Sequence, residues 1–111
     1  MHRLDDRTSA ALARFKLELE QRFAKRLLKV VLFGSYATGR RHDDSDVDLL
    51  ILVSQRLPRD GHSAVDAAVS VMLEYPDVVL SPLVSTPQEF ADLKRRERRL
   101  ALDIEREGIA L

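Results

Sequence analysis

The chain has 111 residues, of which 45% are hydrophobic and 32% charged, a balance typical of a globular domain rather than a disordered tail. Eighteen Lys and Arg against eighteen Asp and Glu give a formal net charge of zero, so overall charge does not favour DNA, RNA or an anionic membrane as partner. The chain has no cysteine, which excludes disulfides, thiolate metal sites and a cysteine nucleophile. We expect one domain over residues 1–111 and, since there is neither a signal core nor a membrane-length apolar run, a cytoplasmic protein.

The first half of the chain predicts one helix and then two strands. Residues 28–33 (LKVVLF) are short and β-branched and predict a strand, which Gly34 ends. Residues 36–39 predict a single helical turn and residues 40–45 a polar loop. Residues 47–53 (VDLLILV) are strongly apolar, which indicates a central strand. The opening helix begins after Asp6, and its apolar residues recur every three or four positions: Leu12, Phe15, Leu19, Phe23 and Leu27.

The second half predicts a helix, a strand and a helix. Over residues 62–75 helical spacing places Val65, Val69 and Met72 on one stripe, which we assign to the core first and to an interface second. Residues 78–84 predict a strand that Pro82 confines to a sheet edge, because proline cannot donate to the ladder. Thr86, Pro87 and Glu89 then form the signature of a capped helix that runs towards Gly108. The succession predicts an α/β (α+β) fold, a small mixed β-sheet flanked by helices.

Two aspartates, Asp46 and Asp48, stand at the start of the apolar strand. Residues two apart in a strand point to the same face, so the two carboxylates lie close together. Like charges at that separation repel each other unless a cation lies between them. Mg²⁺ or Mn²⁺ suits such a pair, because these ions bind one or two carboxylates and take further oxygens from phosphates and water. The spacing therefore predicts a metal site at Asp46 and Asp48.

A phosphate-binding turn is predicted at Gly34 and Ser35, directly after the preceding strand. Glycine lets the backbone approach a phosphate closely, and the Ser35 hydroxyl and free N–H groups of the turn can donate to its oxygens. Arg40 and Arg41 precede the aspartates in the loop, where a guanidinium can clamp a phosphate. Alone, a Gly-Ser usually marks a turn and an Asp-x-Asp a solvated strand end. Together, with ten residues between them, they predict a nucleoside triphosphate bound through a metal ion.

On these residues the chain resembles the nucleotidyltransferase superfamily that includes DNA polymerase β, and within it the minimal nucleotidyltransferases. Members carry Gly-Ser, about ten residues and Asp-x-Asp, matched here by Gly34, Ser35, Asp46 and Asp48. The resemblance implies the polymerase β-like fold, Mg²⁺ as cofactor and ATP as substrate. It also implies a small helical HEPN protein as partner, in a toxin–antitoxin pair in which the nucleotidyltransferase is the antitoxin and transfers AMP to a tyrosine of the toxin.

The chain departs from the family pattern at the third carboxylate, which active members often carry on the third strand. The aligned position is Val79, which cannot bind a metal ion. Asp77 lies two residues earlier, on the same face of a regular strand, and is our candidate substitute in the catalytic set with Asp46 and Asp48. The alternative is that Asp77 is a turn residue after Pro76.

Two further functions stay open. The first is a non-catalytic binding module that neutralises its partner by complex formation, and its support is Val79. The second is RNA modification, which rests only on RNA binding by residues 94–99 (KRRERR). This run has five positive charges against one negative, and its commoner explanation is a solvated helix face.

Overall fold

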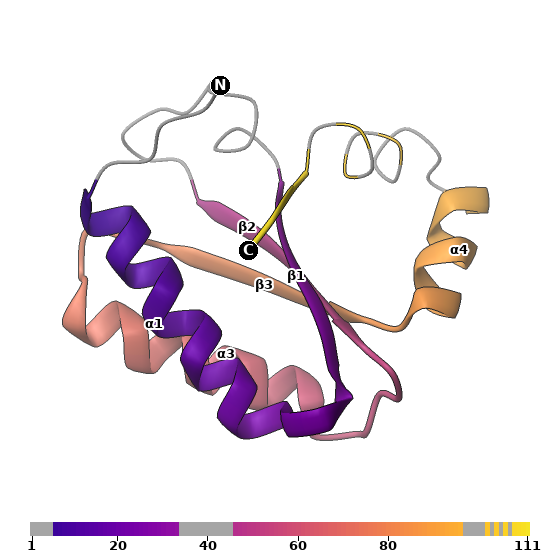
Figure 1. Ribbon diagram of the computed structural model, residues 1–111, viewed down its shortest axis with the longest axis horizontal. Coiled ribbons are helices and arrows are strands. Elements are labelled where there is room, and N and C mark those ends of the chain that lie inside the picture. The colour runs from indigo at the N-terminus through magenta and orange to yellow at the C-terminus, as the bar shows by residue number, and fades with distance from the viewer. Residues whose placement is uncertain (1–5, 34–45, 97–101, 103, 105, 107) are drawn as a thin grey trace.

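A four-stranded mixed sheet forms the centre of the molecule, in the strand order β3-β2-β1-β4 (Figure 1). The computed structural model describes residues 6–33, 46–96, 102, 104, 106 and 108–111. The strands are β1 (Leu27–Phe33), β2 (Val47–Val53), β3 (Leu80–Ser85) and β4 (Ile109–Ala110). β1 runs antiparallel to β2 and to β4, whereas β2 and β3 are parallel. β2 is therefore central and β3 lies at an edge, as the sequence predicts.

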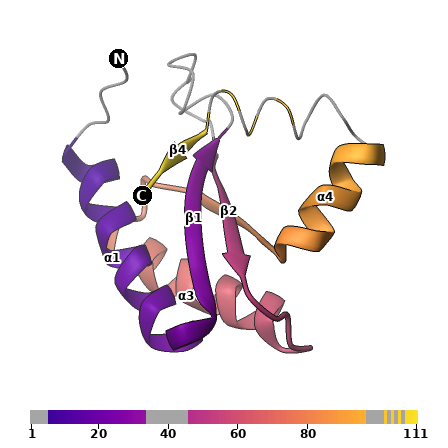
Figure 2. The same ribbon diagram turned by 45° about the vertical axis from the view of Figure 1, so that its right-hand side comes forward.

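The helices are α1 (Asp6–Phe23), followed by the single turn η1 (Ala24–Arg26), then α3 (Asp60–Glu74) and α4 (Pro87–Arg96). α1 and α3 lie side by side against the sheet, whereas α4 lies away from both (Figure 2). This arrangement confirms the predicted α/β (α+β) class with helices flanking a small mixed sheet. No helix in the described part of the chain has the length and hydropathy that a membrane span requires.

Alternate residues of β2 face two different layers. Val47, Leu49, Ile51 and Val53 are fully buried in the main core, together with α1 and α3. Leu50 points the other way and is buried in a second, smaller cluster. A strand with both faces covered must be apolar nearly throughout, which explains the composition of β2.

The apolar stripe of α1 is the predicted one except at Leu27, which begins β1 because the helix ends at Phe23. Leu12, Phe15, Leu19 and Phe23 are at most 4% exposed. The stripe assigned to α3 is wrong in part, because Val65 is 49% and Val69 45% exposed. Small residues form the buried face of that helix instead, together with one valine: Ala64, Ala67, Ala68 and Val71.

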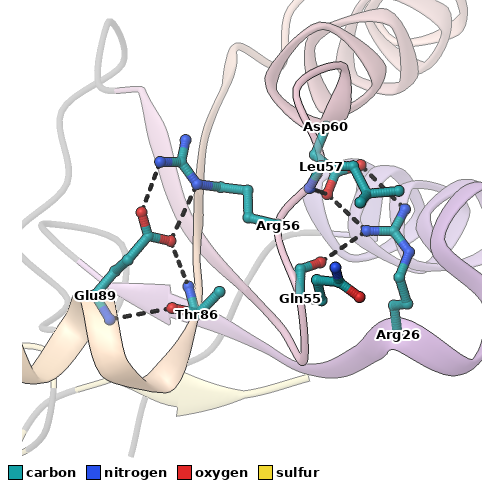
Figure 3. Close-up of polar contacts among 7 residues, drawn as sticks. All are labelled: Arg26, Gln55, Arg56, Leu57, Asp60, Thr86 and Glu89. Carbon is teal, nitrogen blue, oxygen red and sulfur yellow. Dashed lines mark hydrogen bonds and ion pairs between the residues drawn. The ribbon is translucent and has the colours of Figure 1, made fainter.

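Hydrogen bonds and ion pairs of charged side chains connect the ends of helices and strands (Figure 3). Arg26 donates to both carboxylate oxygens of Asp60, at 2.7 and 3.0 Å, and to the carbonyl oxygen of Gln55 at 2.8 Å. The backbone N–H of Leu57 donates to Asp60 as well, so α3 begins at Asp60, two residues before the predicted start. These contacts join η1 to the connection between β2 and α3.

The predicted capping box at the start of α4 is confirmed. The backbone N–H of Glu89 donates to Thr86 Oγ1 at 3.1 Å, and the backbone N–H of Thr86 donates to Glu89 Oε1 at 3.0 Å. Arg56 adds a two-pronged ion pair with the same Glu89 carboxylate. That pair ties α4 to the loop after β2 (Figure 3).

Candidate functional site

Asp46 and Asp48 lie at the start of the central strand, on the face of the sheet away from α1 and α3. Asp48 shares its strand face with Leu50, because residues two apart point the same way. Asp46 directly precedes β2 and is exposed, whereas Asp48 is half-buried. The buried neighbours Val47 and Leu49 anchor this end of the strand in the main core, which holds the carboxylate pair on a rigid element.

The electrostatics of the pair fit a cation site. Burial and, second, the negative charge of Asp46 raise the pKa of Asp48 above its usual range. Within the described residues neither carboxylate has a hydrogen bond or an ion pair. A divalent cation would relieve the repulsion, and two carboxylates with oxygens from phosphate and water form a donor set that suits Mg²⁺ or Mn²⁺.

The neighbouring strands bring two more chain segments to this end of the sheet. Phe33, the residue before Gly34, pairs with Asp48 across the β1–β2 ladder. On the other side Asp48 pairs with Ser81, an exposed serine on β3 that the sequence analysis did not nominate. Only the parallel register of β2 and β3 identifies Ser81 as a neighbour, and that register is not readable from either strand alone.

The other nucleotide-binding residues predicted from the sequence, Gly34, Ser35, Arg40 and Arg41, lie outside the described residues. Their assignment stays a prediction. Of the basic run at residues 94–99, the structure describes residues 94–96, which form the last turn of α4.

The structure does not bring Asp77 to the carboxylate pair. Asp77 lies in the turn before β3, where the guanidinium of Arg7 forks onto it with contacts of 2.6, 2.8 and 3.0 Å. This contact holds the pKa of Asp77 below its usual range, and the same guanidinium lies 5.5 Å from the ring centre of Tyr75. No three His, Asp or Glu side chains among the described residues gather closely enough to hold a metal ion. The turn alternative is therefore the one that the geometry supports, because Arg7 neutralises Asp77 there.

Val79 occupies the position beside Asp46. The backbone N–H of Val47 donates to the carbonyl oxygen of Val79 at 2.7 Å, one step before the first ladder pair of β2 and β3. Val79 is 46% exposed, so nearly half of its surface is accessible to solvent. A valine thus stands where a third carboxylate could reach a metal ion held by the pair.

Comparison with known proteins identifies a family and a relative by sequence. The sequence model of the nucleotidyltransferase domain family matches residues 12–107. A protein of Methanocaldococcus jannaschii, named "Putative protein adenylyltransferase MJ0141", is 36% identical over 72 residues, which cover 63% of this chain and 71% of the relative.

Two solved structures share the fold. One is a mutant of the toxin–antitoxin MntA-HpeT, with a TM-score of 0.58 and 19% identity over 86% of this chain and 68% of the other. The second is a toxin–antitoxin with AMP-PNP, with a TM-score of 0.58 and 21% identity over the same shares of the two chains. At these identities the likeness shows the arrangement of the elements.

Proposed function

Because the chain belongs to the nucleotidyltransferase domain family, we propose that it is a metal-dependent protein adenylyltransferase that takes AMP from ATP. The observation that carries the proposal is the pair Asp46 and Asp48, two carboxylates on one face of the central strand that have no cationic partner among the described residues. The M. jannaschii relative, by its name, supports a protein as acceptor. The structure with AMP-PNP supports an adenine nucleotide as donor.

In this proposal Asp46 and Asp48 hold Mg²⁺ or Mn²⁺, and Gly34, Ser35, Arg40 and Arg41 bind the triphosphate. The metal ion supplies charge neutralisation for the phosphate oxygens. An acceptor hydroxyl attacks the α-phosphorus and loses its proton to water, a new P–O bond forms, and the bond to the β-phosphate breaks so that pyrophosphate leaves. The contribution of the protein is then to position the reactants and to stabilise charge, with little covalent chemistry of its own.

We further propose that the acceptor is a tyrosine of a small helical HEPN-type toxin and that this chain is its antitoxin. The fold likeness to two toxin–antitoxin structures supports this choice. An AMP group on a tyrosine would block that hydroxyl and add a negative charge, which is a direct way to silence a site that binds an anionic substrate.

The proposal is tested with the purified chain, Mg²⁺, ATP labelled in its α-phosphate, and the protein encoded by the adjacent reading frame. We expect label on the partner, and no label when Asp46 and Asp48 are both changed to Asn. The matched control is Asp66→Asn, an exposed aspartate on α3, which should transfer label as well as the wild type. Absence of label with the wild-type chain and partner would refute the transfer.

A second candidate, a nucleotidyltransferase-fold module that neutralises its partner by binding alone, is favoured by Val79 beside Asp46. The two candidates differ in one outcome. If the variant with both aspartates changed to Asn still neutralises the partner, binding is the mechanism. If neutralisation is lost while the complex still forms, transfer is the mechanism.

A further inference from the structure

A groove of about 540 Å³ lies between the start of α3 and the outer edge of β3, and none of the predicted nucleotide or metal ligands lines it. Its apolar lining includes Val65 of α3, which is 49% exposed, and Pro82 and Val84 of β3, which are half-buried. Gly61 lines the same groove, and a Cβ at that position would meet nothing within 4 Å. The missing side chain at Gly61 keeps this end of the groove open.

One wall of the groove is an unpaired strand edge. The carbonyl oxygen of Val79 points towards β2, so by alternation the backbone groups of Leu80, Pro82 and Val84 point to the outer edge. The Leu80 N–H meets the sulfur of Met72 at 3.5 Å on that side, which agrees with this alternation. No described strand pairs with this edge. A ligand can therefore hydrogen-bond to the Val84 N–H and to the carbonyl oxygens of Pro82 and Val84.

Proline limits how long a segment can pair there. Pro82 has no N–H, so an added strand would leave one of its own acceptors unpaired at that point. The usable edge is the short stretch at Val84, which is the part that borders the groove. The ligand is accordingly a short extended segment, bound by few ladder bonds and by side chains in the groove.

The polar side chains that line the groove can donate hydrogen bonds. Arg56 and His62 line it, and no described Asp or Glu does. Arg56 uses Nε and Nη2 for its pair with Glu89, so Nη1 remains a donor (Figure 3). A carboxylate on the bound segment would complement this side of the groove.

We propose that the groove binds a short, extended, acidic–apolar segment of a partner protein. The segment adds to the outer edge of β3 at Val84, places an apolar side chain between Val65 and Val84, and presents a carboxylate to Arg56 and His62. The inference goes beyond the proposed function, because it requires neither a nucleotide nor a metal ion.

The test uses ¹⁵N-labelled full-length chain and a five-residue blocked peptide of alternating glutamate and valine. We expect saturable shifts of the amide signals of Val65, Leu83 and Val84. The same peptide with lysine in place of glutamate should bind at least ~10-fold more weakly, which corresponds to about 1.4 kcal/mol. A version methylated on its central backbone nitrogens should also bind more weakly, since it cannot donate to the ladder.

Two variants at one position separate binding from folding. Gly61→Leu fills the groove, and it should abolish the shifts without lowering Tm, because leucine is a better helix former than glycine. Gly61→Ala is the matched control, since its Cβ enters open space, and it should bind the peptide like the wild type. The variant with Asp46 and Asp48 both changed to Asn should also bind the peptide normally, so failure here is distinct from failure of nucleotidyl transfer.

Three results would overturn the proposal. The first is no saturable shift with the acidic peptide, and the second is equal binding of the acidic and basic peptides. The third is self-association of the chain that Gly61→Leu abolishes, which would make a second copy the occupant of the groove.

Discussion

At the scale of the residue, Asp48 is a carboxylate whose surroundings oppose its charge. Burial and the neighbouring Asp46 both raise its pKa, so in the absence of a cation the ionised pair destabilises the fold. Carboxylates whose ionised form is destabilised by their surroundings are characteristic of functional sites, where a bound ligand compensates for the destabilisation. The sequence predicts this pair from spacing alone, because a strand turns a two-residue interval into a shared face.

The third position of the site is where a single substitution is most informative. Val79→Asp would place a carboxylate beside Asp46, next to the pair. We expect the affinity for Mn²⁺ to rise roughly tenfold, or about 1.4 kcal/mol, measured by calorimetric titration. Val69→Asp is the matched control, because Val69 is 45% exposed, close to the 46% of Val79, and lies on α3. An equal rise in both variants, or none in Val79→Asp, would show that Val79 does not border a metal site.

Asp77 shows what spacing cannot predict. Its position two residues before Val79 suits a metal ligand only if the strand continues through both, but β3 begins at Leu80. The partner that decides its role is Arg7, 70 residues away along the chain. Long-range pairs of this kind are fixed by the packing of α1 against the rest of the fold, and no local pattern reveals them.

At the scale of the element, a nearly buried ion pair fixes the start of α3. The Asp60 side chain is 5% exposed and the Arg26 side chain 26%. Its hydrogen bonds with Arg26, above all, lower the pKa of Asp60. A folded-state pKa below the unfolded value means that this stabilisation is complete above the unfolded pKa and is lost as pH falls through the folded pKa.

Asp60→Asn should therefore lower the free energy of unfolding by about 2–4 kcal/mol at pH 7, because Arg26 keeps its charge but loses its counter-charge. In the wild type, protonation of Asp60 below about pH 4 lowers the free energy of unfolding. The Asn variant should lack this contribution. Urea unfolding of both proteins at pH 7 and pH 3 measures the two effects. If the stability gap between them is the same at both pH values, ionisation of Asp60 does not stabilise the fold.

The strand β4 is the element that the sequence analysis missed. It has two residues, and neither a two-residue alternation nor a turn signal distinguishes it from a helix end. Its pairing depends on Gly108, because a Cβ there would lie 2.3 Å from the carbonyl oxygen of Ile104 and 2.6 Å from Val31 Cγ1. The close approach of Gly108 to Val31 of β1 depends on the tertiary fold, so a local sequence pattern does not predict it.

Gly108→Ala should destabilise the protein by about 1–3 kcal/mol, since neither contact can be kept without a shift of the backbone. We expect faster hydrogen exchange at the Leu111 amide, which donates to the Val30 carbonyl oxygen at 2.9 Å. Gly61→Ala is the control, because its Cβ meets open space and the change should leave stability equal or raise it. An unchanged exchange rate in Gly108→Ala would contradict the packing described for β4.

At the scale of the whole molecule, the parts predicted well are those governed by local periodicity. The stripe of α1, the central strand and the capping box of α4 each follow from spacing within a few residues. The prediction for α3 is wrong because the helix packs against α1 and β3 mainly through small residues, which hydrophobic periodicity does not single out. Val65 and Val69 are left exposed as a result.

The same layering separates two surfaces of the protein. Asp46 and Asp48 stand at the start of β2 on the face away from α1 and α3, whereas the groove follows the outer edge of β3 and the start of α3. A nucleotide at the first and a partner segment at the second would not compete for the same residues. The two proposed sites can therefore be occupied at the same time.

The measurement that tests the central claim most directly is calorimetric titration of AMP-PNP into the chain, with Mg²⁺ and with Mg²⁺ removed by EDTA. We expect binding that requires Mg²⁺ in the wild type and in Asp66→Asn, and a loss of at least ~10-fold in affinity when Asp46 and Asp48 are both changed to Asn. Equal affinity in the wild type and the double variant, or binding that EDTA does not weaken, would contradict a metal–nucleotide site at this carboxylate pair.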